Sequence, residues 1–546
     1  MQKDPTVIET PVLIVGGSLV GLSTAMFLNW HGVPTLNVER HGSTAIHPRA
    51  GHFHLRTLEL FRQVGLEQAI VQASQEQFGR GGGINSVESL AGKEIAQYIT
   101  DLNAGVEAFS PSKRLFLSQQ RLEPLIRTRA EQLGATLLYA TELVSFDQND
   151  TGVTAVIRDL ATGEVKIVRA PYMVATDGNR SQIREKLGIK TSGPGHLSDS
   201  ITIYFKADLE PYVRDREHGV IYVFNEQLRG FFRLEKAAKS GFLVVSTLGD
   251  TTKPGAREVG RDITKDKCIA LLRSAVGVPD LEVEILDVAS WKAHAATAAR
   301  LRSGRVFLAG DAAHVMPPSG GFGGNTGIHD AHNLAWKLAL VHRGIAKEEL
   351  LDTYETERRP ICLTTVDQAY SRWVRRIDPE LGLADAPALM DDLTLEIGYR
   401  YAPHTVNSHK GDFYSDPRAQ PAQPGDRAPH LTLKQGGAII SLLDLFGQKF
   451  VLLTGSKGDA WLKVGAAAAA SWQLPLGAYR IGPDSDLIDV DGSFQERYGL
   501  DAAGAALVRP DGYIAWQSQP GDIPSLDSMS EVLGRLTGRH ETKVDA

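Results

Sequence analysis

The sequence predicts an α/β protein in which a Rossmann-like nucleotide-binding domain carries an inserted antiparallel β-sheet and is followed by a smaller thioredoxin-like domain. Three observations predict this fold class. An apolar strand near the N-terminus runs into a glycine turn and a helix, short strands rich in aromatic and β-branched residues occupy about 192–290, and a second strand–glycine–helix segment follows at 304–342. Because 546 residues exceed one ordinary core, two or three domains are expected.

The N-terminal motif has the features of a dinucleotide-binding βαβ unit. Its strand ends in a turn that contains Gly16, Gly17, Ser18 and Gly21. Glu39 ends the next strand, about 20 residues further on, where its carboxylate can accept hydrogen bonds from a ribose. Glycines let a pyrophosphate approach backbone N–H groups at a helix N-terminus. Ser18 replaces the middle glycine of the G-x-G-x-x-G fingerprint, and its hydroxyl could bond to the phosphate. The alternative is a glycine turn without a ligand.

Further polar residues follow this motif along the chain. Arg40 and Arg49 either neutralise a pyrophosphate and line a cofactor channel, or lie on the solvated surface. Gln119 stands at the start of a helix expected from 118 to 133, where it faces a ligand or is only a neighbour of the cap. Asp177 and Gly178 close another apolar strand and precede a short helix, which repeats the logic of the first motif.

A second glycine-rich cradle lies far along the chain. The buried strand 306–309 is closed by Gly310 and Asp311, and the glycine-rich stretch 319–327 precedes a long helix expected at 328–342. Bare backbone at a helix start offers N–H groups to an anionic or electron-rich ligand. This pattern therefore predicts a second ligand-binding element.

The aromatic strands predict a sheet that could wall an apolar pocket. Their large side chains are Tyr204, Tyr222, Phe224, Phe231 and Phe232, although ordinary sheet core is the alternative for each. Residues 79–110 look like a mobile loop or the start of an inserted layer. The expected domains are the nucleotide-binding domain (1–190 and 291–375), the inserted sheet (191–290), a helical extension and linker (376–424) and the thioredoxin-like domain (425–546).

Composition and charge exclude several classes of function. A net charge of −7 and a pI near 6.2 argue against a general nucleic-acid binder. The sequence has no apolar run of membrane-spanning length and no apolar signal core at its start. Cys268 and Cys362 lie far apart, so neither a CxxC redox pair nor a cysteine-rich metal site is expected, and a cytoplasmic location fits.

Three motifs now stand together in order: Gly16-Gly17-Ser18-Leu-Val-Gly21 with Glu39, then Asp177-Gly178, then Gly310-Asp311-Ala-Ala-His314 with Pro317. In this combination the chain resembles the FAD-dependent aromatic hydroxylases, the para-hydroxybenzoate hydroxylase and phenol hydroxylase group of flavoprotein monooxygenases. The segments 424–430, 442–447 and 507–516 are similar to the C-terminal domain of the phenol hydroxylase and aromatic polyketide hydroxylase branch. The resemblance covers nearly the whole chain.

The resemblance implies the cofactor contacts. Residues expected to bind FAD are Gly16, Gly17, Ser18, Gly21, Glu39, Arg40, Arg49, Gln119, Asp177, Gly178, Asp311, Gly324 and Asn325. Asp311 would bind a ribityl hydroxyl, and the backbone N–H groups of Gly324 and Asn325 would lie on the flavin pyrimidine. Pro317 would lie beside the reactive edge of the flavin. The chain departs from the family's Gly-Gln-Gly-Met-Asn segment at Phe322 and Gly324.

The implied function is an NADPH- or NADH-consuming monooxygenase that hydroxylates a phenolic or polycyclic aromatic ring with O2 through a flavin hydroperoxide. Tyr222 and Arg233, on strands expected to face the pocket, are the side chains favoured for catalysis beside Pro317; His52, His54 and His314 are alternatives. Alternative functions are Baeyer–Villiger or epoxidising chemistry on the same fold, or flavin binding without turnover. The last domain, which has no cysteine, is expected to serve packing or association, such as homodimer formation.

Overall fold

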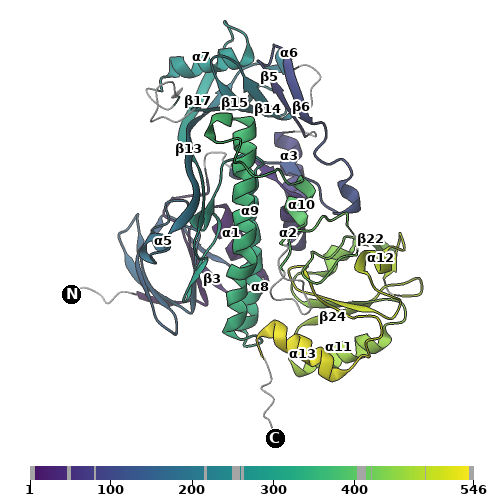
Figure 1. Cartoon of the computed structure of the whole chain (residues 1–546). Helices are drawn as coiled ribbons and strands as arrows, with labels where there is room; N and C mark the ends of the chain where they lie inside the picture. The colour runs from purple at the N-terminus through teal and green to yellow at the C-terminus, as the bar shows by residue number, and fades with distance from the viewer. Residues whose placement is uncertain are drawn as a thin grey trace, which may run out of the picture.

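The computed structural model describes residues 6–45, 51–78, 82–213, 218–248, 259, 263–401, 413–419, 421–485 and 487–539. Figure 1 shows three parts: a nucleotide-binding domain, a sheet domain above it and a C-terminal domain at its side, with the long helix α9 (Thr353–Arg376) running upright between them. The α/β fold class predicted from the sequence is confirmed. Among the described helices, none combines the length and apolarity needed to cross a membrane.

The nucleotide-binding domain is built on a six-stranded sheet that is parallel except at one edge. Its strands in spatial order are β18 (Arg302–Ser303), β19 (Val306–Leu308), β12 (Tyr172–Ala175), β2 (Val12–Val15), β3 (Thr35–Val38) and β8 (Thr136–Leu138). The central strands are buried at every position, as expected for a sheet covered on both faces. On one side lie the helices α1 (Leu19–Trp30), α4 (Gln119–Gln132) and α8 (Phe322–His342).

A second, four-stranded sheet shares the same core. It contains β1 (Thr6–Glu9), β11 (Val165–Ala170), β10 (Val153–Asp159) and β9 (Thr141–Gln148), whose inward residues join the main hydrophobic cluster. The remaining elements of this part are α2 (Leu55–Gln63), α3 (Glu67–Gln77), α5 (Gln182–Lys186), the strand pair β4 (His52–Phe53) and β7 (Leu115–Phe116), and the 3₁₀ helices η1 (Val106–Ala108), η2 (Gly310–Ala312) and η3 (Glu348–Asp352).

The inserted domain is an eight-stranded sheet. Its strands in spatial order are β20 (His314–Val315), β17 (Glu284–Ala298), β13 (Thr191–Lys206), β16 (Ser240–Ser246), β15 (Arg229–Leu234), β14 (His218–Phe224), β5 (Gly83–Val87) and β6 (Glu94–Ile99). The pairing of β14 with β5 is parallel, so the sheet is mixed rather than purely antiparallel. Within the segment 79–110, residues 83–99 thus start the inserted layer, because β5 and β6 join this sheet from outside the range 191–290 expected for it.

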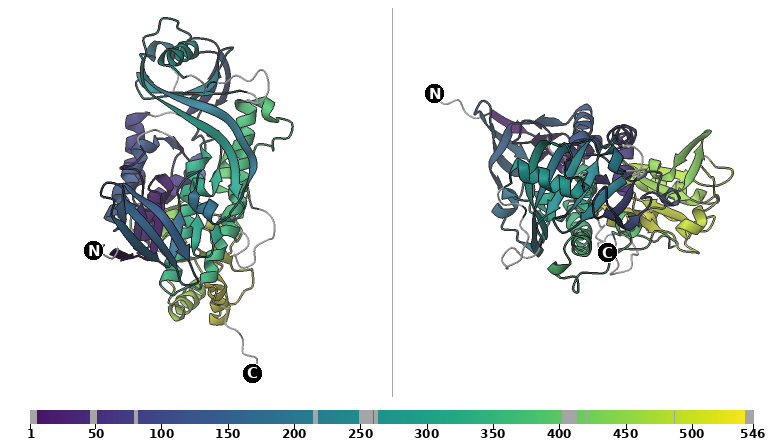
Figure 2. Two further views of the ribbon diagram at one scale, coloured as in Figure 1. Left: turned by 90° about the vertical axis from the view of Figure 1, so that its left-hand side faces the viewer. Right: turned by 90° about the horizontal axis from the view of Figure 1, so that it is seen from above.

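The two longest strands connect this sheet to the nucleotide-binding domain. β13 and β17 pair along their length and curve from one domain into the other, as the left view of Figure 2 shows. The helix α7 (Lys265–Val276) covers the outer face, where Phe205 and Phe232 form a core with Cys268 and Leu272, and α6 (Glu210–Val213) lies nearby. Phe232 is therefore core rather than pocket wall. The opposite face of the sheet looks toward the nucleotide-binding domain.

The C-terminal domain has the four-stranded sheet and flanking helices of a thioredoxin-like unit, as expected. The sheet order is β24 (Leu476–Arg480), β23 (Phe450–Thr454), β26 (Ala505–Val508) and β27 (Ile514–Gln517). Helices α11 (Asp459–Ser471) and α13 (Leu526–Thr537) pack together. The remaining elements are β21 (Thr432–Gln435), β22 (Ala438–Ser441), β25 (Ile488–Asp489), α12 (Phe494–Tyr498) and η6 (Leu442–Leu445).

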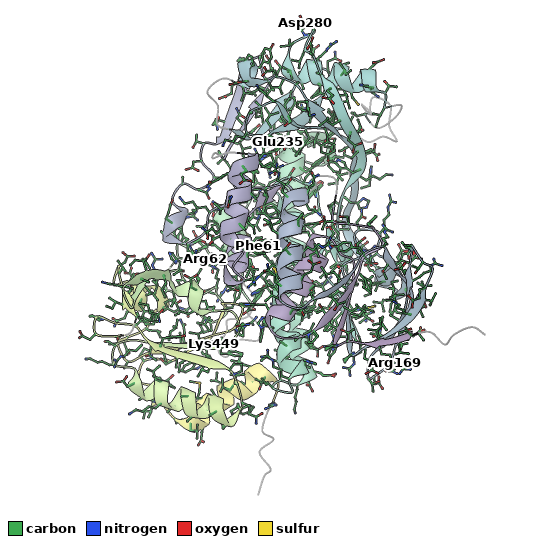
Figure 3. All side chains as sticks on the ribbon, turned by 180° about the vertical axis from the view of Figure 1, so that it is seen from behind. Phe61, Arg62, Arg169, Glu235, Asp280 and Lys449 are labelled. Carbon is green, nitrogen blue, oxygen red and sulfur yellow. The ribbon has the colours of Figure 1, made fainter. Side chains whose placement is uncertain are left out.

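Buried ion pairs join the C-terminal domain to the rest of the chain. Arg427 contacts Glu59 of α2, with its Nε 2.9 Å from the carboxylate. Arg509 forms two hydrogen bonds of 2.6 and 2.9 Å with Glu357 of α9. All four side chains are at most 5% exposed. Figure 3 shows the junction from behind, with Arg62 of α2 beside the C-terminal domain, where it pairs with Asp444 at 2.6 Å.

The segment 376–424 is predicted to be a helical extension and linker. Its described part contains η4 (Pro379–Leu381) and a helix, α10 (Asp392–Ile397), that is largely buried. Within α10, Glu396 forms a buried ion pair of 2.9 Å with Arg114. This part of the segment packs inside the molecule and places α10 at the central cavity.

Candidate active site

One large cavity, of about 2030 Å³, lies between the nucleotide-binding domain and the inserted sheet. Its floor is the carboxyl edge of the parallel strands, where ligands bind in open α/β sheets. Single ligands usually occupy roughly 300–1,000 Å³, so this cavity has room for a cofactor and a second molecule. The predicted site residues at its surface are Gly16, Gly17, Ser18, Glu39, Arg40, Gln119, Asp177, Gly178, Tyr222, Arg233, Asp311, Pro317 and Gly324.

Among the described residues, two that were predicted for the site, Gly21 and Asn325, do not line the cavity. Gly21 lies in α1 behind the turn, where a Cβ would collide with the carbonyl oxygen of Gly16. It therefore serves close packing of helix against strand. Asn325 is 1% exposed and lies within the first turns of α8. Arg49 falls outside the described residues.

The first cradle is already shaped for a nucleotide. Gly16 has a φ of 109°, which disfavours any residue with a Cβ. The Gly17 N–H donates to Glu39 Oε2 at 2.6 Å, and the N–H of His41 donates to Oε1 at 2.8 Å. Two backbone donors thus fix the Glu39 carboxylate beside the turn, in the position from which a ribose hydroxyl is recognised.

The Ser18 hydroxyl has a different role from the phosphate contact expected of it. It donates to Glu123 Oε1 at 2.6 Å and accepts from Gln119 Nε2 at 2.9 Å. The hydroxyl proton is therefore used within the protein, and the N–H groups of Gly16 and Gly17 donate to Val38 O and Glu39, so the phosphate donors that remain are the backbone N–H groups at the start of α1. Glu123 was not singled out from the sequence, because its partners lie up to 105 residues away.

The second cradle packs directly against the first helix. A Cβ added at Gly310 or Gly327 would lie 2.7 or 2.5 Å from a methyl group of Val20 in α1. Asp311 follows at the end of β19 and is exposed in the cavity. The helix α8 begins at Phe322, with Gly321 as its N-cap at a φ of 74°. Its positive N-terminal end faces the cavity, where electron-rich groups are stabilised.

The Asn325 side chain latches this helix start to the chain around α2. Its Oδ1 accepts from His54 N at 3.0 Å and from Thr57 Oγ1 at 2.6 Å. Its Nδ2 donates to the carbonyl oxygens of His52 at 2.9 Å and Gly321 at 2.7 Å. The side chain is thus occupied, and only the backbone of this turn remains for a ligand.

Phe322 is part of the cavity rim but only 4% exposed. Its ring lies 5.1 Å from the ring of His54, and the Arg372 guanidinium lies 5.1 Å from its centroid. Gly320 is needed beside it, because a Cβ there would collide with the ring. The aromatic ring that departs from the family pattern therefore braces the glycine loop.

Tyr222 and Arg233 both reach the cavity from the lower face of the inserted sheet, Tyr222 on β14 and Arg233 on β15. Tyr222 contacts the rings of Phe224 and Phe231, and Arg376 of α9 also lines the cavity. Arg233 is 4% exposed and donates to the carbonyl oxygen of Gly219.

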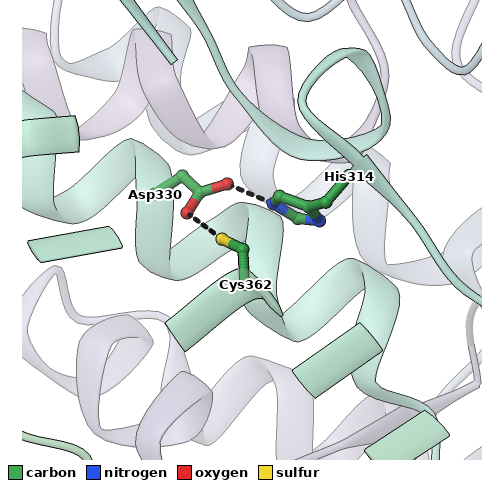
Figure 4. Close-up of side chains that lie close together, drawn as sticks. All are labelled: His314, Asp330 and Cys362. Carbon is green, nitrogen blue, oxygen red and sulfur yellow. Dashed lines mark hydrogen bonds and ion pairs between the residues drawn. The ribbon is translucent and has the colours of Figure 1, made fainter. Parts of the chain in front are cut away.

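The three histidines considered from the sequence do not fit a proton acceptor at neutral pH. Burial lowers the pKa of His52 to about 3 and that of His54 to about 4. His314 is buried, and its Nε2 lies 2.6 Å from Asp330 Oδ2 (Figure 4). These geometries give all three a structural role.

Asp330, another residue that sequence reasoning missed, ties this buried cluster to the second cradle. Its Oδ2 accepts from the backbone N–H of Gly310 at 3.1 Å, and its Oδ1 accepts from Arg358 Nε at 2.8 Å. The thiol of Cys362 lies 3.8 Å from Oδ1, as Figure 4 shows. Because a guanidinium already occupies the carboxylate, the cluster is an ion-pair network and not a vacant set of metal ligands.

The cavity fits FAD on this structure's own evidence. Two glycine turns face it, and the first is packed so closely on Thr176 that a Cβ at Gly16 would collide with the Thr176 carbonyl oxygen. In addition, Asp177 Oδ1 is buried at the cavity and has no hydrogen-bond partner among the described residues. Burial raises the pKa of this carboxyl. A ligand with hydroxyl donors would satisfy that oxygen.

Fold and site together define a flavin-dependent oxygenase of aromatic rings, and comparison with protein families agrees. An FAD-binding domain model matches residues 9–369, and an aromatic-ring hydroxylase C-terminal model matches residues 421–539. The chain belongs to the FAD-dependent aromatic-ring hydroxylases.

Individual relatives cover almost the whole chain. It is 56% identical to a 4-methyl-5-nitrocatechol 5-monooxygenase of Burkholderia sp., over 95% of both chains. It is 41% identical to a putative polyketide hydroxylase of Streptomyces halstedii, over 94% of both. The crystal structure of an aklavinone-11 hydroxylase with FAD and aklavinone superposes with a TM-score of 0.91 at 34% identity, covering 97% of this chain and 99% of that one.

The protein is therefore an FAD-dependent, NAD(P)H-consuming aromatic monooxygenase. Bound FAD supplies the redox chemistry, taking electrons from NAD(P)H and delivering one atom of dioxygen to the ring. Two helix N-termini, those of α1 and α8, face the cavity with backbone N–H groups that suit an anionic ligand. The inserted sheet forms the opposite wall of the cavity.

Proposed function

We propose that this enzyme hydroxylates a single-ring catechol that carries an electron-withdrawing substituent, of which 4-methyl-5-nitrocatechol is the model. The relative at 56% identity is named for that compound, whereas the relatives named for polycyclic substrates lie at 41% identity or less. A nitro group makes a catechol acidic, so such a substrate presents an oxygen anion at neutral pH. The observation that carries the proposal is a cation buried in the wall of the cavity.

That cation is Arg233. Its guanidinium carbon lies 4.0 Å from the ring centroid of Phe78 and 3.9 Å from that of Phe116, so two aromatic faces enclose it. Burial lowers its pKa to about 9, which keeps it charged at neutral pH. A cation in an apolar wall forms charge-assisted hydrogen bonds with phenolate or nitro oxygens and favours the ionised substrate. Arg233 is therefore assigned to substrate binding.

Tyr222 limits the size of the substrate. Tyr98 stands edge-on to its ring at 6.1 Å, and the Arg376 guanidinium lies 5.7 Å from the centroid of the Tyr98 ring. Through Tyr98, these contacts connect β14 to the end of α9 at the cavity. A cavity wall that is held in place in this way suits a single-ring substrate better than an extended polycyclic one. Tyr222 thus contacts the substrate by its ring rather than acting as a base.

The cofactor contacts follow from the two cradles. We assign the phosphates to the turn from Gly16 to Ser18, a ribose to Glu39, a ribityl hydroxyl to Asp311, and the flavin edge to Pro317. Arg40, Gln119, Gly178 and Gly324 lie on the same cavity surface and complete the set. Two free, buried thiols at Cys268 and Cys362 suit the reducing cytoplasm in which NAD(P)H is supplied.

The test is product analysis with labelled dioxygen. The purified enzyme is incubated with NADPH or NADH and either 4-methyl-5-nitrocatechol or a polycyclic quinone. Oxygenation at the carbon that carries the nitro group releases nitrite and leaves one labelled oxygen on the ring. Turnover of the polycyclic compound with no reaction of the catechol would overturn the proposal.

A matched pair of variants tests Arg233. Arg233→Met should raise KM for the nitrocatechol about 10- to 100-fold, since a hydrogen bond to a charged group contributes roughly 1.5–3 kcal/mol. Arg229→Met on the same strand is the control, because Arg229 does not line the cavity. FAD content should be unchanged in both. Equal KM values for the two variants would remove Arg233 from substrate binding.

A further inference from the structure

Three segments that line the nucleotide end of the cavity converge on one buried carboxylate. Glu123 Oε1 accepts from Ser18 Oγ at 2.6 Å and from Gln119 Nε2 at 2.6 Å. Glu123 Oε2 accepts from the backbone N–H of Ala45 at 2.6 Å. Ser18 caps α1, Gln119 begins α4, and Ala45 follows the strand β3 that ends before Glu39. Glu123 is 0% exposed and lies behind these segments rather than on the cavity surface.

The residue type is what this position requires. Three donors, a hydroxyl, an amide and a backbone N–H, point at one place. A carboxylate accepts through both oxygens, whereas glutamine has a single acceptor oxygen and would turn an N–H toward Ala45. An apolar residue would leave all three donors without this partner inside the protein. Glu123 therefore acts as a common acceptor that fixes three separate pieces of chain.

We propose that Glu123 is a positioning residue for the nucleotide half of FAD. By accepting from Ser18 it turns that hydroxyl away from the cavity and leaves the backbone N–H groups at the start of α1 to the pyrophosphate. By accepting from Ala45 it anchors the chain that follows Glu39. The inference rests on the proposed placement of the cofactor phosphates at the Gly16–Ser18 turn.

The negative charge of Glu123 opposes this positioning role. A carboxylate behind a pyrophosphate site repels the phosphates, so it would weaken cofactor binding if it did nothing else. Removing only its charge should then strengthen binding, and removing its hydrogen bonds should weaken it. The two effects have opposite signs, which allows an experiment to separate them.

The experiment measures the Kd of the full-length protein for FAD, and for ADP as a competitor, in five variants, one of which, Ser18→Ala, removes only the hydroxyl that donates to Glu123. Glu123→Ala should raise both Kd values about 30-fold or more, as expected for losing several hydrogen bonds to a charged group. Glu123→Gln loses only the hydrogen bond from the Ala45 N–H, so it should give a smaller increase in both Kd values. Glu131→Ala on the same helix, whose carboxylate is exposed and pairs with Arg127, is the matched control. Gly16→Ala reports on the phosphate placement itself.

The outcomes are distinct. An equal loss of FAD and ADP affinity in Glu123→Ala, with the control unchanged, supports the proposal. A Kd for FAD in Glu123→Gln at or below that of the wild type shows that charge repulsion dominates and overturns it. If Glu123→Ala does not fold, Glu123→Gln and Ser18→Ala still decide the question, since each removes one arm. If Gly16→Ala retains FAD affinity, the phosphate placement fails instead.

Discussion

Replacing Asn325 by aspartate tests whether the latch at the start of α8 holds the cofactor site. The change preserves shape and keeps the acceptor for His54 and Thr57. It replaces the two donated hydrogen bonds, at 2.9 and 2.7 Å, by contacts between an anionic oxygen and the carbonyl oxygens of His52 and Gly321. Each buried carbonyl that loses its donor costs about 1–3 kcal/mol. Stronger bonds from His54 and Thr57 offset part of this, which leaves a net cost of about 3 kcal/mol.

Since the first turn of α8 must keep its position for FAD to bind, that cost corresponds to a roughly 100-fold increase in the Kd for FAD. Equilibrium ultrafiltration of the purified variant measures it directly. Asn149→Asp is the control, because Asn149 is exposed and its side chain accepts from Thr151 and Gly152 through its oxygen alone. A Kd for Asn325→Asp within a few-fold of the wild type would refute the latch.

Three further predictions concern the cofactor, the domain junction and pH. Asp311→Ala should yield a colourless protein without FAD; a yellow, fully loaded variant would contradict its assignment. Arg427→Met should lower the free energy of unfolding by about 3–5 kcal/mol in urea titrations, because it strips a partner from the buried Glu59 carboxylate; a loss below about 1 kcal/mol would contradict this. Burial lowers the pKa of His31 to about 3 and of His54 to about 4, so the unfolded chain binds more protons below pH 6.5, the ordinary pKa of histidine. Stability should fall by about 4 kcal/mol between pH 6.5 and 4.5 through this pair, and His31→Asn should remove about half of that pH dependence.

The local signals in the sequence predicted the nucleotide-binding frame well. The strand at Thr35–Val38 has the expected bounds, and the long helix after the second glycine cradle exists. That helix begins at Phe322, six residues before the expected start at Ile328. Glycines lower helix propensity, but Gly327 is required by its close contact with Val20, so tertiary packing overrides propensity here.

Other features could not be found locally because their partners are distant in sequence. A proline in a helix interior usually breaks the helix, yet α9 continues through Pro360, with buried residues such as Tyr354 and Trp373 packed on either side. The burial of Glu396 has no local signal, because its partner Arg114 is 282 residues away. The same holds for Ser18 and Glu123. In the sequence alone, charged residues that pair across such distances look like surface residues, because they become partners only in the folded protein.

The position of α9 has a consequence for protein engineering. One end of this 24-residue helix carries Glu357, held by Arg509 of the C-terminal domain, and the other carries Arg372 and Arg376 at the substrate cavity. About 28 Å of continuous helix separates Glu357 from Arg376, at 1.5 Å per residue. A chimera that exchanges the C-terminal domain between homologous enzymes must therefore retain the buried arginine–glutamate pairs. A C-terminal domain without these pairs would displace α9 and alter substrate preference, although no residue in the cavity had been changed.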